Sequence, residues 1–163
     1  ETIGRVVDLN NQIIKSHGVE VSVNVPDEIW VDAIPAHLDS IFHNLLTNAI
    51  KYGTTADSKR ILINADVGKG KVVVSVQDFG LGIDLERFRD KLFQLGSRLH
   101  MASADGQGLG LYMTKNQIEG LGGQIEVESE VGKGTTFRVT LPVKAVDLAS
   151  VKVTPASSGE QGD

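Results

Sequence analysis

Hydrophobic residues recur every three or four positions between Pro35 and Tyr52, a spacing that predicts an amphipathic helix. The apolar positions of this helix are Leu38, Ile41, Phe42, Leu45 and Ala49. One step around the helix, the same spacing selects a polar set, Asn44, Asn48, Lys51 and Tyr52. A purely structural helix would more naturally carry Glu and Lys on its second face, so two asparagines four residues apart suggest a binding role. The alternative is a half-buried helix whose amides are incidental.

Upstream of this helix, the pattern predicts another helix and two short strands. Helical spacing covers residues 2–16, and His17-Gly18 is a typical helix end. Strict alternation of apolar and polar residues over 19–25 predicts a strand, and 29–32 is a candidate second strand.

Downstream, the pattern predicts two hairpins on either side of a helix that ends near Leu121. The first hairpin joins residues 60–67 and 71–78 through Gly68-Lys69-Gly70, and the last joins 124–130 and 135–141. Between them, residues 84–95 should be helical or irregular. Residues 96–107 have few periodic apolar positions and are expected to form a mobile loop.

Two glycine-rich segments carry candidate chemistry. Asp78 ends a predicted strand and is followed by Gly80 and Gly82. This arrangement is either a tight turn or a pocket in which a carboxylate accepts a hydrogen bond from an exocyclic amine. The segment from Gly106 to Leu111 opens the second helix, where free N–H groups can bind phosphate, but it lacks the strand context of a dinucleotide-binding motif.

Composition narrows the class of protein. The 163 residues suit one domain, placed here at residues 1–142, and the Ser-, Gly- and Pro-rich residues 143–163 are expected to be a disordered tail or linker. A net charge of −5 argues against nucleic acid as a partner. The absence of cysteine fits the cytoplasm, and no apolar run is long enough for a membrane span. A start at Glu1 without methionine suggests a fragment of a longer chain.

Taken in order, these segments resemble the catalytic ATP-binding domain of bacterial sensor histidine kinases, in the superfamily that includes gyrase, Hsp90 and MutL. The resemblance spans residues 19–142. Its motifs are the N box from Asn44 to Tyr52, the G1 box from Asp78 to Ile83, the F box at Leu92-Phe93 with Gly96-Ser97-Arg98, the G2 box from Gly106 to Leu111, and the glycine turn from Gly132 to Phe137.

The resemblance implies an α+β fold, a two-layer sandwich of the Bergerat type with a mixed sheet packed against helices and a mobile ATP lid. It implies ATP and Mg²⁺ as ligands. Asn48 would be the principal Mg²⁺ ligand, with Asn44 contributing, which suits the preference of Mg²⁺ for hard oxygen ligands. Lys51 would approach the phosphates, and Arg98 could reach the γ-phosphate. Asn48, Lys51 and Arg98 are thus the implied catalytic residues.

For the base, the resemblance implies that Asp78 accepts the adenine amino group while Thr135 holds a bridging water. Tyr52 would pack near the adenine. The residues that would shape the ring pocket are Gly80, Gly82 and Ile83.

For the lid, Phe93 would be the anchor, and the G2 glycines would permit closure and offer N–H groups to the phosphates. The implied nucleotide-binding residues here are Gly106, Gln107, Gly108, Leu109, Gly110 and Leu111. Two positions depart from the family pattern: Gln107 replaces the usual Thr, and Gly96 replaces the second aromatic of the F box. Both put the details of the lid in doubt.

The opening helix also separates two chemistries. Hydrolytic members of the superfamily carry a general-base glutamate four residues before the metal-binding asparagine, where this chain has Asn44. Since an amide cannot take up the proton, the sequence favours phosphoryl transfer over ATP hydrolysis. The alternatives are a serine kinase of the anti-sigma-factor type and a nucleotide-binding regulatory module without transfer.

The partners follow from the same resemblance. The implied phosphoacceptor is a histidine on a separate dimerisation domain upstream in the full-length protein, and a response regulator receiver domain is the second implied partner. None of the four histidines has the acidic neighbour and downstream proline of an acceptor motif; they are His17, His37, His43 and His100. The isolated domain is therefore expected to be monomeric and unable to phosphorylate itself.

Overall fold

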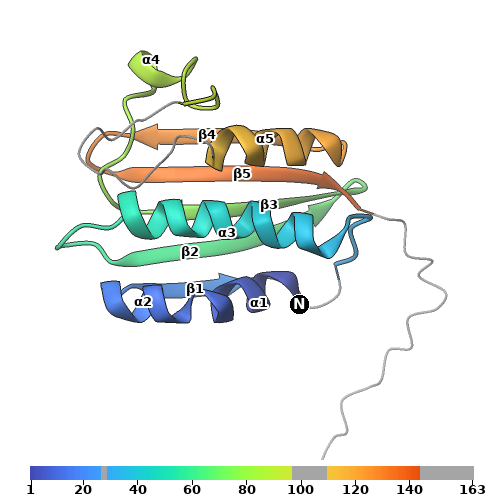
Figure 1. Ribbon diagram of the computed structural model, residues 1–163, viewed down its shortest axis with the longest axis horizontal. Helices are drawn as coiled ribbons and strands as arrows, with labels where there is room; N and C mark the ends of the chain where they lie inside the picture. The colour runs from blue at the N-terminus through green and yellow to red at the C-terminus, as the bar shows by residue number, and fades with distance from the viewer. Residues whose placement is uncertain (27–28, 97–109, 144–163) are drawn as a thin grey trace, which may run out of the picture.

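The computed structural model describes residues 1–26, 29–96 and 110–143, which form a sheet with helices on one face (Figure 1). The strand order is β1-β2-β3-β5-β4. The strands are β1 (Glu20–Asn24), β2 (Arg60–Gly68), β3 (Lys71–Asp78), β4 (Gln124–Glu130) and β5 (Gly134–Pro142). β1 is parallel to β2, and the other pairs are antiparallel. The predicted α+β sandwich with a mixed sheet is confirmed, as are both hairpins.

The helices are α1 (Thr2–Leu9), α2 (Asn11–His17), α3 (Pro35–Tyr52), α4 (Leu85–Phe88) and α5 (Gly110–Gly120). α3 crosses the middle of the helical layer, with α5 beside it. α3 begins with Pro35. Proline lacks an N–H group, but the N–H groups of a first helical turn have no partner within the helix, so no hydrogen bond is lost. None of the helices within the described ranges is both long and apolar enough to cross a membrane.

The prediction of one N-terminal helix over residues 2–16 was wrong at Asn10. This side chain is only 5% exposed. Its Nδ2 donates to the Val6 carbonyl at 2.8 Å and lies 3.0 Å from Nδ1 of His43 on α3. Asn hydrogen-bonds the nearby backbone readily, which competes with helix continuation, and here α1 ends and α2 begins around it. The predicted end at Gly18 is confirmed by its left-handed φ of 63°.

The candidate strand at residues 29–32 was also wrong. Val31 makes only an isolated bridge to Val143. Trp30 beside it is 63% exposed, whereas Ile29 and Val31 are half-buried and pack against the core. Residues 84–95 contain the short helix α4 followed by turns. The expected mobile loop at 96–107 lies almost wholly outside the described residues, as do 144–163 of the expected tail.

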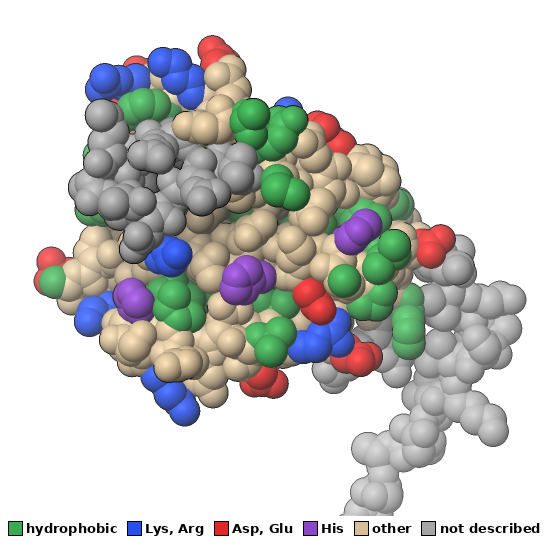
Figure 2. All heavy atoms as spheres, in the orientation of Figure 1, with side chains coloured by type: hydrophobic (Ala, Val, Ile, Leu, Met, Phe, Trp, Pro, Cys, Tyr) green, Lys and Arg blue, Asp and Glu red, His purple; other side chains and the backbone are tan. Residues whose placement is uncertain are grey.

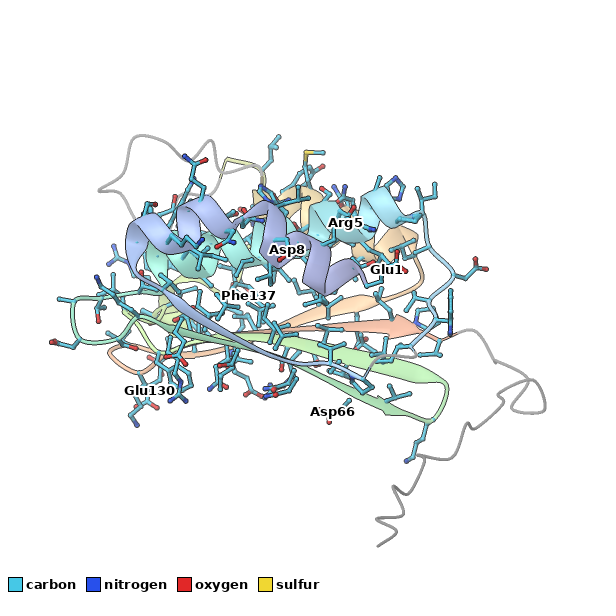
Figure 3. All side chains as sticks on the ribbon, turned by 90° about the horizontal axis from the view of Figure 1, so that it is seen from below. Glu1, Arg5, Asp8, Asp66, Glu130 and Phe137 are labelled. Atoms are coloured by element: carbon cyan, nitrogen blue, oxygen red, sulfur yellow. The ribbon has the colours of Figure 1, made fainter. Side chains whose placement is uncertain are left out.

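The core lies between the helices and the inner face of the sheet. Alternation along β2 buries Ile61, Ile63 and Ala65. α3 contributes Ile41 and Leu45, both fully buried, and each such side chain is worth roughly 1.5–3 kcal/mol of transfer free energy. Figure 3 places Phe137 between the layers, with Asp66 and Glu130 on the side away from the helices. One helical stripe and one sheet face therefore account for most of the burial.

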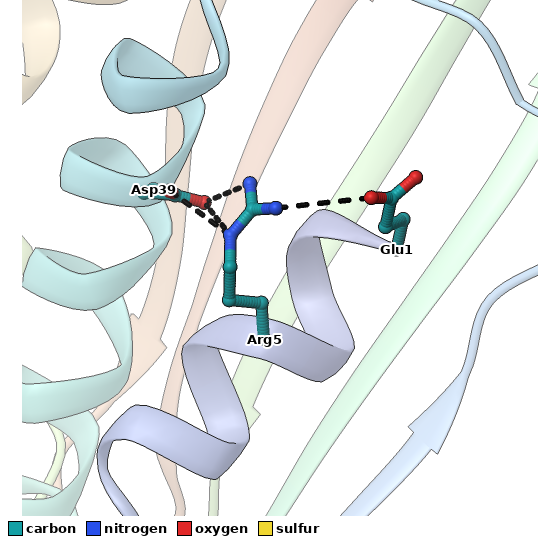
Figure 4. Close-up of polar contacts among 3 residues, drawn as sticks. All are labelled: Glu1, Arg5 and Asp39. Carbon is teal, nitrogen blue, oxygen red and sulfur yellow. Dashed lines mark hydrogen bonds and ion pairs between the residues drawn. The ribbon is translucent and has the colours of Figure 1, made fainter.

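α1 is attached to α3 by an ion pair on the helical face (Figure 4). Nη2 of Arg5 lies 2.8 Å from Oδ1 of Asp39, and its Nε lies 3.1 Å from Oδ2. Glu1 is 4.0 Å from the same guanidinium. Because the pair is partly exposed, it adds geometric definition to the α1–α3 contact more than stability.

The β4–β5 turn offers a matched test of the backbone. Gly132 and Gly134 both have positive φ, but a Cβ at Gly132 would meet open space, whereas one at Gly134 would overlap the Asp78 carbonyl oxygen. Gly132→Ala is expected to cost about 1 kcal/mol and Gly134→Ala more than about 3 kcal/mol of unfolding free energy, measured by urea denaturation with circular dichroism. Equal costs would contradict the close approach at Gly134.

Candidate functional site

The polar face of α3 meets α5 through two side-chain hydrogen bonds. Nε2 of Gln117 donates to Oγ of Ser40 at 3.2 Å, and Nδ2 of Asn44 donates to Oγ1 of Thr114 at 3.2 Å. Moving four residues along α3 is thus matched by moving three residues back along α5, because the two helices are antiparallel. The next step on α3 reaches Asn48 and brings it toward the first turn of α5, where helix N–H groups are unpaired.

At the C-terminal end of α3 lies Asp78, the last residue of β3. Its side chain is buried, and Oδ1 accepts the N–H of Gly80 at 3.1 Å and of Thr135 at 3.2 Å. Burial raises the pKa of Asp78 to about 6, although the two N–H donors act in the opposite direction. Among the described residues, no hydrogen bond reaches Oδ2. The carboxylate therefore keeps one oxygen for a donor from a ligand.

Three glycines bring this carboxylate against the neighbouring backbone. A Cβ at Gly53 would overlap the Asp78 carboxylate, one at Gly80 would overlap the Gly53 carbonyl, and one at Gly134 would overlap the Asp78 carbonyl. The end of α3, the loop after β3 and the start of β5 can meet only because these positions lack a side chain. Of these three glycines, the sequence predicted a site role only for Gly80. Gly53 comes directly after Tyr52, so its position at the end of the N-box helix was a signal that could have identified it.

Ser129 on β4 links the other predicted pocket residues. Its Oγ accepts the N–H of Ile83 at 2.7 Å, lies 2.8 Å from Oγ1 of Thr135 and donates to the Gly134 carbonyl at 2.9 Å. Gly82 has φ of 68° and packs against the Glu130 carbonyl. The loop after β3 is thereby held on the β4–β5 turn. The sequence contains no local signal for Ser129, because its partners are distant in the chain.

Some of the remaining predicted residues lie in the described part of the chain and others lie outside it. Phe93 lies edge to face with Phe137 at 6.4 Å between ring centroids, which ties the segment after α4 to the core. Lys51 is exposed and Tyr52 half-buried on the last turn of α3, while Gly110 and Leu111 begin α5. Outside the described residues lie Arg98, His100, Gly106, Gln107, Gly108 and Leu109.

The donor set fits a Mg²⁺-nucleotide. Asn44 and Asn48 offer amide oxygens, which are hard ligands, and Asp78 offers a buried acceptor beside glycine backbone that a flat ring can approach. The structure places Asn44 against α5 through Thr114, and Asn48 lies one helical turn further along the same side of α3. It brings Asp78, Gly80 and Thr135 together at the end of the same helix.

Asp78 makes stability depend on pH. Between its unfolded pKa of 3.8 and its folded pKa of about 6, the folded state binds more protons, so stability is lost as pH rises through this window. Relative to Asp78→Asn, the wild-type free energy of unfolding should fall by on the order of 2–3 kcal/mol from pH 4 to pH 7 in urea titrations. Asp66→Asn on the outer face is the control for loss of a carboxylate, and a pH-independent difference for Asp78→Asn would contradict the assignment.

Comparisons with known proteins show the family of this chain. A family model described as "Histidine kinase-, DNA gyrase B-, and HSP90-like ATPase" matches residues 33–145. The sensor histidine kinase YcbM of Bacillus subtilis is 35% identical over 132 residues, covering 78% of this chain and 42% of that protein. The chain spans between 18% and 42% of the length of the first four curated relatives.

Two solved structures share the fold. The catalytic domain of histidine kinase ThkA superposes with a TM-score of 0.72 at 27% identity, covering 86% of this chain and 90% of that one. Full-length ShkA in complex with AMPPNP gives a TM-score of 0.73 at 26% identity, covering 87% of this chain and 29% of that one. With the family match running from the segment before α3 to the end of β5, the chain belongs to the histidine kinase-, DNA gyrase B- and HSP90-like ATPase family, as a catalytic ATP-binding domain of the sensor histidine kinase type.

Proposed function

We propose that this domain holds Mg²⁺-ATP between α3 and the start of α5 and transfers the γ-phosphoryl group to a histidine on a separate dimerisation domain. The observation that carries the proposal is the arrangement of α3. Its two asparagines lie on the side that faces α5, and its C-terminal end meets the buried Asp78 carboxylate. Phosphate ligands and a base acceptor thus sit at two ends of one surface. The complex of the related ShkA with AMPPNP supports nucleotide binding by this fold.

Each group has a defined role in the proposal. Asp78 accepts the adenine amino group through its free oxygen, and Gly80, Gly82 and Ile83 border the ring. Asn48, helped by Asn44, would hold Mg²⁺, which when bound neutralises phosphate charge. Lys51 and Arg98 would contact the phosphates. Because phosphoryl transfer needs little covalent chemistry from the protein, positioning and charge supply the rate enhancement.

Asn44 supports transfer over hydrolysis. Its amide cannot act as a general base for water, and its nitrogen donates to Thr114. Slow turnover of ATP by the isolated domain is therefore part of the proposal. In the described chain His17, His37 and His43 are all exposed on helices, and none has an acceptor context. The acceptor is accordingly assigned to another domain, and a response regulator receiver domain is assigned as a further partner. The isolated domain is proposed to be monomeric and cytoplasmic.

The same helical face carries a groove of about 1080 Å³ beside the nucleotide surface. It runs between the residues that lead into α3 and the outer side of α5. Its apolar lining includes Ile34, Leu95, Tyr112 and Met113, which are 37–63% exposed. Figure 2 views this face, where hydrophobic side chains gather near the start of α3 and over α5. An apolar surface next to the phosphate end of the site suits the amphipathic helix that would present the acceptor histidine.

Labelled ATP tests the reaction itself. With the cognate dimerisation domain added in trans, the domain is expected to produce acid-labile, base-stable label on that domain, and Asn48→Ala should reduce it by about 100-fold or more. Acid-stable label on a partner would instead support a serine kinase. Nucleotide binding without any transfer would support a regulatory module, and steady ATP hydrolysis abolished by Asn48→Ala would support an ATPase.

The groove is tested with a single charge. Met113→Glu places a carboxylate on the apolar lining, so phosphotransfer to the dimerisation domain should fall by about tenfold or more through weaker docking, with nucleotide affinity unchanged. Val131→Glu, at a residue 66% exposed on the β4–β5 turn, is the matched control and should transfer normally. Calorimetry measures nucleotide binding and label transfer measures docking. Equal transfer by the two variants would remove the groove from the proposal.

A further inference from the structure

Thr114 is a buried hydroxyl that the proposed site does not use. It is fully buried on α5, four residues before Ile118, which is equally buried. Valine has nearly the same shape and would bury without a polar atom, so a hydroxyl here is costly unless it is hydrogen-bonded. Its partner is Nδ2 of Asn44, at 3.2 Å. The hydroxyl thus meets the one side chain on α3 that stands a single turn before Asn48.

We propose that Thr114 is a positioning residue for the Mg²⁺ site, acting through Asn44. An amide is planar, and its oxygen and nitrogen lie on opposite sides of the carbonyl carbon. With the nitrogen donating to Thr114, the oxygen of Asn44 is turned away from the Thr114 hydroxyl and is left for a metal. Loss of the hydroxyl frees the amide to rotate, so that its nitrogen can take the place of the oxygen toward the metal. The inference rests on the proposed function.

The contact also couples two helices. α5 directly follows residues 97–109 in the chain, and α3 carries both asparagines. Any displacement of α5 along its axis moves Thr114 relative to Asn44 and so alters the presented oxygen. The neighbouring contact between Gln117 and Ser40, one turn away, joins the same helices without touching Asn44. It is therefore an internal control for helix packing alone.

The experiment compares Thr114→Val, which keeps the shape, with Thr114→Ser, which keeps the hydroxyl, and with Ser40→Ala. Calorimetric titration with AMPPNP, across a series of Mg²⁺ concentrations and in EDTA, gives the Mg²⁺-dependent part of nucleotide affinity. Thr114→Val should lower the apparent Mg²⁺ affinity by about three- to tenfold, with EDTA-state affinity and melting temperature little changed. Thr114→Ser and Ser40→Ala should retain wild-type Mg²⁺ dependence. In nucleotide-free protein, the side-chain amide NMR signals of Asn44 should shift in Thr114→Val only.

Two further variants make the outcomes separable. In an Asn44→Ala background, Thr114→Val should have no additional effect on Mg²⁺ dependence, because the partner it acts through is gone. An equal effect in both backgrounds, or loss of Mg²⁺ dependence in Ser40→Ala, would overturn the positioning role. Asn48→Ala reports on the proposed function itself: if it leaves Mg²⁺ dependence intact, the metal site is wrong, whereas if it abolishes that dependence and Thr114→Val does not change it, only the present inference fails.

Discussion

The close approach of backbone around the Asp78 carboxylate is the constraint on which the rest of the site depends. Three segments distant in sequence meet there: the end of α3, the loop after β3 and the start of β5. Each contact requires a glycine, because any Cβ would overlap a carbonyl or the carboxylate itself. The end of the proposed site at Asp78 is therefore defined by missing side chains, and the end at Asn44 and Asn48 by present ones.

Burying the ionised Asp78 carboxylate costs free energy in the folded state, and a ligand that donates a hydrogen bond to it could offset that cost. Burial raises the pKa of Asp78 to about 6, so near neutral pH an ionised carboxylate sits in a poorly solvated place with two N–H donors. An amine from a nucleotide base would supply a further donor to the remaining oxygen. The ionised carboxylate thus lowers the stability of the folded state near neutral pH, a cost often found at binding sites and consistent with the acceptor role proposed for Asp78.

α3 serves the core and the site with different faces of one helix. Its apolar stripe is buried against the sheet, and this packing fixes the orientation of the neighbouring polar stripe. Asn44 and Asn48 are consequently aimed at α5 by the packing of Ile41 and Leu45, without a dedicated scaffold. The Asn10 contact with His43 and the Arg5 contact with Asp39 attach the N-terminal helices to the same element. The N-terminal helices and α5 therefore all contact α3.

The sequence by itself determined the bounds of α3, the two hairpins and the fold class, and it selected Asn44, Asn48 and Asp78 as the site residues of the proposal. These follow from local periodicity, from a proline and glycines at element ends, and from motif order. Only the tertiary structure decided that Thr114 contacts Asn44, that Ser129 contacts Ile83 and Thr135, and that Gly53 lies against Asp78. It also decided that the N-terminal helix breaks at Asn10 and that residues 29–32 form no strand. Each of these features depends on whether residues far apart in the chain are in contact. Local sequence patterns, which reflect only neighbouring residues, do not predict such contacts.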